Sequence, residues 1–299
     1  MPEGIASYLT PQELQRLGRL VLQSRYVVEG SLAGRHRSPL KGASSEFAEH
    51  RAYIAGDDPK HIDWKVLGRT DRYYVRRYED ETNLRVYLIV DRSASMGYTS
   101  HTRTKYDFAC HLAAAIGYVV VKAKDSVGLC LYSEGIDGMM GARNSFAHLN
   151  NALKFLHHQK PAAKTSTAKT LHSIADDIRR RALIVLFSDL LDEQEEVIKA
   201  LAHFRKQHHD VIILQTLDPA EIEFPFKQGT EFIDLETDER ILTDPRALAT
   251  DYRRAFGEFL DRYRQACNEL NIDHRVVDTS KPLDLFVREY LEQRKKFTA

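Results

Sequence analysis

Residues 84–96 read Leu84-Arg85-Val86-Tyr87-Leu88-Ile89-Val90-Asp91-Arg92-Ser93-Ala94-Ser95-Met96, an apolar run that stops abruptly at a carboxylate followed by two hydroxyls. Such a run is typical of a buried parallel strand. Asp91, Ser93 and Ser95 stand at spacing two on the loop that leaves this strand, and they offer hard oxygen ligands. These ligands suit Mg²⁺ or Mn²⁺ better than Zn²⁺. The pattern therefore predicts part of a divalent-cation site, although Asp and Ser also cap ordinary turns in this way.

The composition is that of an ordinary soluble protein. The chain has 299 residues, 43% of them hydrophobic, which is enough to bury a sizeable core. Its 43 acidic residues balance its 43 basic ones, so no overall field favours nucleic acid or an anionic membrane.

The sequence contains neither a recognisable targeting signal nor a cysteine pattern typical of disulfides or zinc sites. Residues 1–10 lack the basic start and apolar core of a signal peptide, and no apolar stretch reaches the roughly 18 residues that span a bilayer. We therefore expect a cytoplasmic protein without a membrane span. The three cysteines are far apart and form no CxxC pair, so we expect buried free thiols rather than disulfides or a zinc site.

From residue 86 onward, strand-like and helix-like segments alternate. This pattern predicts an α/β fold, a three-layer, doubly wound and mostly parallel sheet covered on both faces by helices. The predicted strands are 86–90, 127–132, 182–188, 211–217 and 274–278. The predicted helices are 106–122, 145–156, 168–180, 193–207, 245–270 and 282–294.

Two segments lie outside this alternation. Residues 1–83 form an N-terminal extension with a helix over 10–27 and a short helix after Asp58-Pro59, and we expect it to pack on the core domain of residues 84–299. Within that domain, 219–244 contains a predicted β-hairpin whose arms are 231–235 and 240–243.

Further oxygen ligands follow other strands. Asp189 comes directly after the predicted strand 182–188, and the run Lys164-Thr165-Ser166-Thr167 precedes a helix. In an open parallel sheet, ligands gather beyond the carboxyl ends of the strands. The three segments are therefore expected to converge.

The three motifs, in this order, resemble the metal-ion-dependent adhesion site of von Willebrand factor A domains. The matching positions are Asp91, Ser93, Ser95, Thr165 and Asp189. The resemblance implies direct coordination of Mg²⁺ or Mn²⁺ by the two serines, with the aspartates close by or bridged through water and the threonine joining in one state. It also implies that an acidic residue of a protein partner completes the metal's coordination.

Two positions depart from the A-domain pattern. Lys164 replaces the usual glycine before the threonine, and Leu190 replaces the usual glycine after the last aspartate. A cation at Lys164 would weaken metal binding.

A narrower resemblance, to the DUF58 family, covers nearly all of the chain. It is carried by residues 51–64 (RAYIAGDDPKHIDW), 76–81 (RRYEDE), 277–283 (VDTSKPL) and 290–294 (YLEQR). The resemblance implies a bacterial, non-enzymatic protein that works with a MoxR-type AAA+ ATPase in the assembly or maturation of other proteins.

Two other functions are compatible with parts of the sequence. A Mg²⁺-dependent phosphohydrolase could use Asp91 as a phosphoryl acceptor, but such enzymes need a second carboxylate two residues on, where this chain has Ser93. No GxSxG, HExxH or P-loop motif is present. Arginines and tyrosines interleave over 69–78, as in RNA-binding surfaces, yet they also alternate as in an edge strand, and Glu79-Asp80-Glu81 follows directly.

Overall fold

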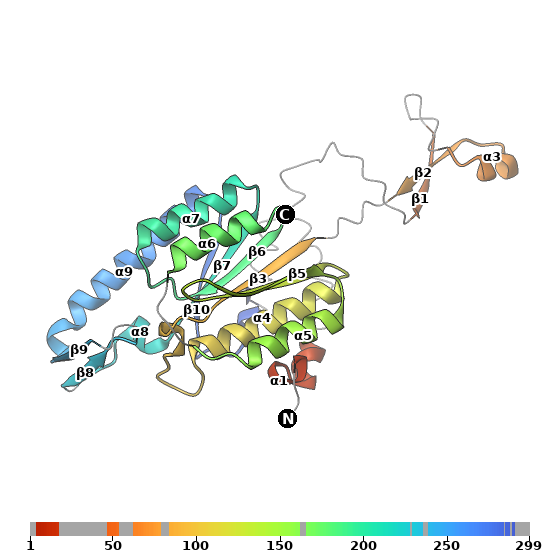
Figure 1. Cartoon of the computed structure of the whole chain (residues 1–299). Coiled ribbons are helices and arrows are strands. Elements are labelled where there is room, and N and C mark those ends of the chain that lie inside the picture. The colour runs from red at the N-terminus through yellow and green to blue at the C-terminus, as the bar shows by residue number, and fades with distance from the viewer. Residues whose placement is uncertain are drawn as a thin grey trace. The chain divides into compact units, whose positions relative to one another are not determined.

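The computed structural model describes most of the chain, in two compact units (Figure 1). One unit comprises residues 35–83, and the other comprises residues 1–34 together with 84–299. The described residues are 4–17, 47–53, 62–78, 84–161, 166–227, 229–235, 239–283, 285–287 and 289–290.

A six-stranded sheet with the order β10-β7-β6-β3-β4-β5 forms the centre of the larger unit. Its strands are β3 (Arg85–Asp91), β4 (Ser126–Tyr132), β5 (Ile136–Arg143), β6 (Leu183–Ser188), β7 (Asp210–Leu217) and β10 (Asp273–Asp278). All neighbours are parallel except β4 and β5. The five predicted strands are confirmed. The sequence does not predict β5, because Gly138 and Gly141 give it a low strand propensity.

Helices cover both faces of this sheet (Figure 1). On one face α4 (Lys105–Lys122) and α5 (Phe146–His157) bury Leu112 and Leu153 in one hydrophobic cluster. On the other, α6 (Thr167–Asp177), α7 (Gln194–Lys206) and α9 (Pro245–Glu269) bury Ile174, Leu201 and Tyr263 in a second. The predicted α/β class with a mostly parallel central sheet is therefore confirmed.

Strand β3 is the point where the winding of the sheet reverses. It lies between β4 and β6 and is parallel to both. The chain runs from β3 through α4 to β4 on one side, and it later returns through α6 to β6 on the other. The carboxyl end of such a strand opens into a crevice between loops that diverge to opposite faces. Asp91 is the last residue of β3 and stands at this crevice.

Two short helical segments near the N-terminus pack on the larger unit. Helix α1 (Ile5–Tyr8) and the helical residues 11–17 contribute Tyr8, Leu9 and Leu17 to the first hydrophobic cluster. The predicted helix over 10–27 is therefore confirmed for 11–17, and its remainder lies outside the described residues.

In the smaller unit, β1 (Phe47–Ala52) pairs antiparallel with β2 (Tyr74–Tyr78), which confirms the strand predicted there. Asp63 caps α3 (Trp64–Thr70) by accepting hydrogen bonds from the backbone N–H groups of Lys65 and Val66. The predicted helix start at Asp58-Pro59 lies outside the described residues.

The predicted hairpin is confirmed as β8 (Thr230–Ile233) and β9 (Arg240–Thr243). It lies between α8 (Pro219–Glu223), which follows β7, and α9.

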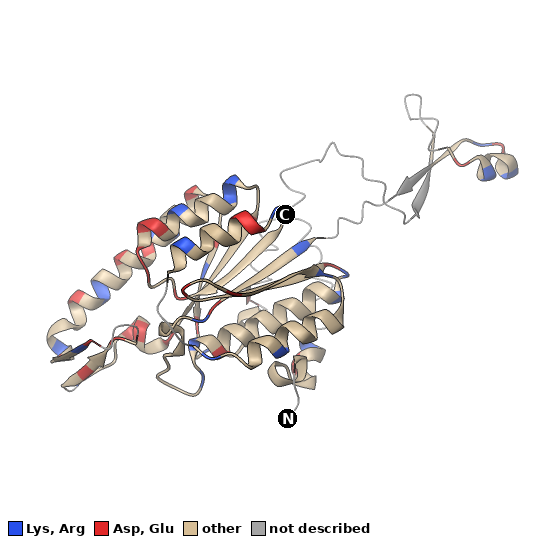
Figure 2. Cartoon of the chain, in the orientation of Figure 1, with Lys and Arg blue, Asp and Glu red and all other residues tan. Residues whose placement is uncertain are grey.

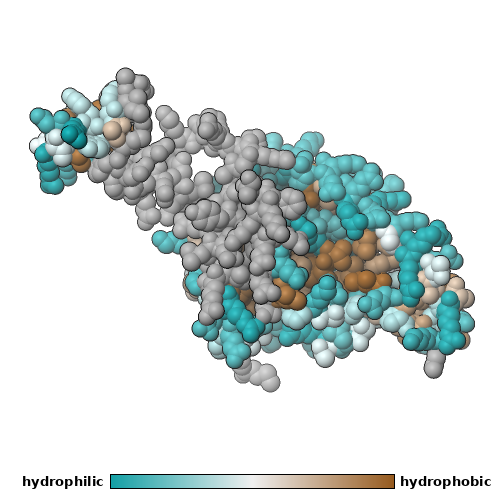
Figure 3. Space-filling model, turned by 180° about the vertical axis from the view of Figure 1, so that it is seen from behind, coloured by the Kyte–Doolittle hydropathy of each residue, from teal (hydrophilic) through white to brown (hydrophobic). Residues whose placement is uncertain are grey.

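The surface carries both charged and hydrophobic regions. Acidic and basic residues are interspersed along α7 and α9 (Figure 2). Some of their side chains form ion pairs, such as Lys199 with Glu196 and Arg254 with Asp251. From behind, a hydrophobic area lies in the middle of an otherwise largely hydrophilic face (Figure 3). Within the described part of the chain, no helix combines the length and the apolar character needed to cross a membrane.

Candidate metal site

Asp91 is almost completely buried and already hydrogen-bonded on both oxygens. Its Oδ1 accepts from the backbone N–H of Ser93 at 2.8 Å, and its Oδ2 accepts from the hydroxyls of Ser188 at 2.7 Å and Tyr132 at 3.2 Å. Burial, and after it the charge of Asp189, raise the pKa of Asp91 to about 7, against the opposing effect of the hydrogen bonds. A positive charge nearby would stabilise the ionised form.

The hydrogen bond between Asp91 and Ser93 turns the chain and brings the two serines together. The Oγ atoms of Ser93 and Ser95 are 3.0 Å apart. Ser93 is fully buried, whereas Ser95, which begins the short 3-10 helix Ser95–Gly97, is partly exposed. Ser95 is therefore the member of the motif that an outside group can approach.

Asp189 follows the last residue of β6 and lies beside Asp91 at the same end of the sheet. Its Oδ1 accepts from the backbone N–H of Leu191 at 3.1 Å, and its backbone carbonyl accepts from the Gln215 side chain at 2.9 Å. Leu190, the residue where A domains usually have glycine, has φ 58° and a fully buried side chain. A left-handed backbone costs a non-glycine residue roughly 1–2 kcal/mol, so this loop is locally strained.

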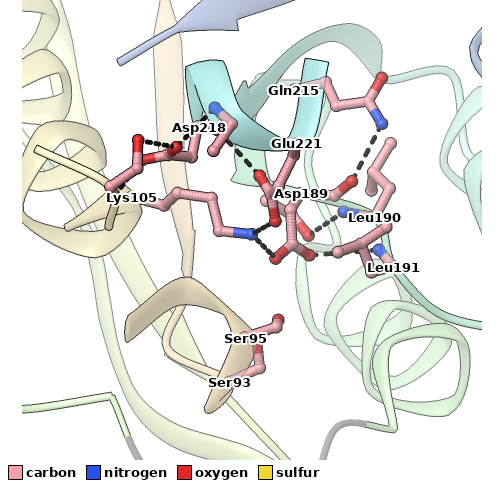
Figure 4. Close-up of polar contacts among 12 residues, drawn as sticks. Ser93, Ser95, Lys105, Asp189, Leu190, Leu191, Gln215, Asp218 and Glu221 are labelled. Atoms are coloured by element: carbon pink, nitrogen blue, oxygen red, sulfur yellow. Dashed lines mark hydrogen bonds and ion pairs between the residues drawn. The ribbon is translucent and has the colours of Figure 1, made fainter. Parts of the chain in front are cut away.

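The second oxygen of Asp189 is bound by a lysine that sequence reasoning did not identify. Nζ of Lys105, the first residue of α4, lies 2.8 Å from Asp189 Oδ2 and 2.5 Å from Glu221 Oε1, and its side chain is fully buried (Figure 4). Burial alone would lower the pKa of Lys105, but the charges of Asp189 and Glu221 outweigh it and raise the pKa to about 12. Lys105 is therefore a buried ammonium ion.

Glu221 was also missed. It belongs to α8, where Asp218 and Glu221 form a capping box: Asp218 caps the helix, and the backbone N–H of Asp218 donates to Glu221 Oε2 at 2.8 Å. Burial raises the pKa of Glu221, and the adjacent Lys105 counteracts this. Local sequence patterns carry no signal for this pair beyond a helix start at Lys105 and a helix cap at Asp218, because Lys105 and Glu221 meet only in the tertiary structure.

The structure brings together Asp91, Ser93, Ser95 and Asp189, four of the five predicted ligands. Thr165, the fifth, lies outside the described residues, as does Lys164. Among the described residues, the basic side chain that contacts this site is Lys105. No group of three His, Cys, Asp or Glu side chains suited to a metal occurs in the described ranges, so any metal here would depend on hydroxyl oxygens.

These donors fit a hard divalent cation. The paired hydroxyls and the buried carboxylates are all oxygen ligands. Burial and the charge of Asp189 raise the pKa of Asp91, and a cation bound beside it would stabilise its ionised form.

A pocket of about 350 Å³ adjoins the site. Its polar lining comes from Ser95, Glu221 and Asp234. Five aromatic residues also line it: Tyr98, Phe224, Phe226, Phe232 and Tyr252. Three further lining residues are large, apolar and exposed: Leu191 (41%), Ile233 (43%) and Leu235 (48%). The polar site thus passes directly into an apolar surface.

Comparison with known proteins gives uncharacterised relatives. Two of them, Uncharacterized protein Rv1480 of Mycobacterium tuberculosis and Uncharacterized protein Mb1516 of Mycobacterium bovis, are each 29% identical over 252 residues, which is 82% of this chain and 78% of theirs.

Solved structures that the chain matches include an aerotolerance-related membrane protein of Bacteroides fragilis (15% identity, TM-score 0.46, 70% of this chain and 99% of that one). Another is the conserved hypothetical protein BatB of Bacteroides thetaiotaomicron (12% identity, TM-score 0.44, 71% and 99%).

The family model for DUF58, a protein family of unknown function, matches residues 49–265. This range contains the strands β3, β4, β6 and β7 and every described residue of the candidate site. The chain therefore belongs to the DUF58 family.

Proposed function

We propose that this protein is a non-enzymatic module of the von Willebrand factor A type that binds another protein through a divalent metal ion. The observation that supports this most is the convergence of Asp91, Ser93, Ser95 and Asp189 at the carboxyl end of β3, where the sheet reverses its winding. Ligands bind at this place in open α/β sheets.

Mg²⁺ or Mn²⁺ would be held by the hydroxyls of Ser93 and Ser95, with Asp91 and Asp189 balancing its charge and Thr165 added on the A-domain resemblance. The ion would supply a Lewis acid whose exchangeable positions accept a carboxylate from outside. The partner is therefore a protein that presents an aspartate or glutamate. The partial exposure of Ser95 supports approach from this side.

The pocket specifies the partner further. Ser95 and five aromatic side chains line the same pocket, so a bulky apolar side chain close to the partner's acidic residue would fill the pocket while the carboxylate reaches the metal. Leu191, Ile233 and Leu235 would be covered by the same contact.

The resemblance to DUF58 proteins adds the biological context to this proposal. The proposed partner is a MoxR-type AAA+ ATPase, which either binds this protein directly or acts in the same process. That proposed process is the assembly or maturation of other proteins in the bacterial cytoplasm.

The environment of Asp91 does not favour the phosphohydrolase alternative. A nucleophilic carboxylate needs an oxygen that substrate can reach. Asp91 is 1% exposed, and both of its oxygens accept hydrogen bonds. No observation on the described residues favours the RNA-binding alternative over the antiparallel pairing of β1 with β2.

The test measures binding of candidate partners to the immobilised protein. The first candidate is a purified MoxR-type ATPase of the same bacterium, and any protein that the immobilised chain recovers from the lysate is a further candidate. Mg²⁺-dependent binding is expected to vanish in EDTA and in the Ser93→Ala/Ser95→Ala variant. Ser173→Ala, an exposed serine of α6, is the control and should bind like the wild type. Binding that is equal with and without EDTA, and equal in the double variant, contradicts the proposal.

A further inference from the structure

We propose that Lys105 competes with the metal ion: its ammonium group binds both Asp189 and Glu221, and it releases Asp189 while it keeps Glu221 when a divalent cation binds. This inference rests on the proposed function, because it concerns the affinity of the same site. It adds a residue that determines when the site accepts a metal.

The carboxylate of Asp189 could bind either of two cations, the ammonium group of Lys105 or the proposed metal ion. Asp189 Oδ2 accepts from Lys105 Nζ at 2.8 Å, while Asp189 Oδ1 is engaged by the backbone N–H of Leu191. A metal bound near Ser93 and Ser95 that used the charge of Asp189 would therefore meet the ammonium group on the same side chain (Figure 4). Two cations at one carboxylate repel each other strongly in a buried site.

Glu221 provides the lysine with a second partner. Its Oε1 is 2.5 Å from the same Nζ, so Lys105 can release Asp189 without becoming an unpaired buried charge. An unpaired buried ammonium would be costly, and a lysine with Asp189 as its only partner would resist displacement.

The charges of the four groups fit one divalent cation. Asp91, Asp189 and Glu221 bring three carboxylates, and Lys105 brings one ammonium. When Lys105 pairs with Glu221 alone, the two aspartates remain to balance a doubly charged ion.

The inference predicts opposite effects for the two ends of the same ion pair. Lys105→Met removes the competitor and is expected to tighten Mn²⁺ binding at least about tenfold, or 1.4 kcal/mol. Glu221→Gln removes the alternative partner, so Lys105 stays on Asp189 and Mn²⁺ binding weakens. Lys122→Met, at the exposed far end of the same helix, should leave the affinity unchanged.

The experiment is titration of the purified full-length chain with Mn²⁺, followed by electron paramagnetic resonance of the free ion, with thermal unfolding in EDTA and in Mn²⁺ as a check on folding. Tighter binding by Lys105→Met, and weaker binding by Glu221→Gln, support the inference. A crystal structure of the Mn²⁺ form should show Lys105 Nζ on Glu221 and beyond hydrogen-bonding distance of Asp189.

Two outcomes overturn the inference. If Lys105→Met binds Mn²⁺ no more tightly than the wild type, while wild-type binding still requires Ser93 and Ser95, Lys105 is not a competitor and the proposed function stands. If neither the wild type nor Lys105→Met binds Mn²⁺, both the inference and the proposed metal site are wrong.

Discussion

Nζ of Lys105 lies 2.8 Å from Oδ2 of Asp189, so an ammonium group from the first turn of α4 binds the carboxylate that follows β6. The contact is fully buried on the lysine side and is shared with Glu221. It links three segments that are far apart in the sequence and places a permanent cation beside the candidate metal ligands. Stability and metal binding should therefore depend on the same residue.

The stability effect can be measured in the absence of metal. Lys105→Met leaves Asp189 and Glu221 close together without a cation, and removal of one partner from a buried ion pair costs about 3–5 kcal/mol. Urea unfolding in EDTA should show a loss of this size. Adding Glu221→Gln in the same chain should restore part of it, because one of the two uncompensated charges disappears. A loss below about 1 kcal/mol would mean that the pair is hydrated and weak.

The buried Asp91 predicts a pH dependence. Its pKa is raised from 3.8 to about 7 in the folded protein, so the unfolded chain releases the proton first as the pH rises. In EDTA this group therefore contributes stability that is complete below pH 4 and is lost as the pH approaches 7, by about 1–4 kcal/mol in total.

Asp91→Asn should remove this decline in urea unfolding measured between pH 4.5 and pH 7.5. Saturating Mn²⁺ should reverse the decline in the wild type, because the metal stabilises the ionised carboxylate. Identical pH profiles of the wild type and Asp91→Asn would contradict the raised pKa.

The pocket predicts a variant that separates partner binding from metal binding. Ile233→Asp places a charge on the apolar wall of the pocket, and it should weaken binding of the Mg²⁺-dependent partner about tenfold or more. Mn²⁺ affinity should not change. Leu248→Asp, an equally exposed leucine in α9 outside the pocket lining, is the control. Equal losses in both variants, measured by biolayer interferometry, would rule out a specific role for the pocket.

Leu190 tests the balance between backbone strain and burial. Leu190→Gly relieves a left-handed backbone worth roughly 1–2 kcal/mol, but it removes a fully buried side chain worth about 2–5 kcal/mol. The net expectation is a loss of about 1–3 kcal/mol in urea unfolding. A gain in stability would show that strain dominates in this loop.

The central sheet was predictable from the sequence because its parallel strands are buried on both faces. Leu88, Ile89 and Val90 pack against helical layers on opposite sides, so the strand reads as a continuous apolar run. Strand β5 escaped prediction because it lies at the antiparallel edge of the sheet and contains glycines.

The two candidate aspartates were predictable because each stands at the carboxyl end of a strand. Asp91 ends β3, and Asp189 follows β6, so local sequence is enough to place both at the same edge. Lys105 and Glu221 reach the site through tertiary structure alone, since α4 must pack on the sheet before the lysine can meet the segment after β7. Their local patterns predict only a helix start and a helix cap.

The central claim is that the hydroxyls of Ser93 and Ser95 bind a divalent cation. Isothermal titration of the wild type with Mn²⁺ at pH 7.5 should show saturable binding of one ion per chain. The Ser93→Ala/Ser95→Ala variant should show no measurable binding while it unfolds at the wild-type temperature in EDTA. Unchanged Mn²⁺ affinity in a folded double variant would contradict the account.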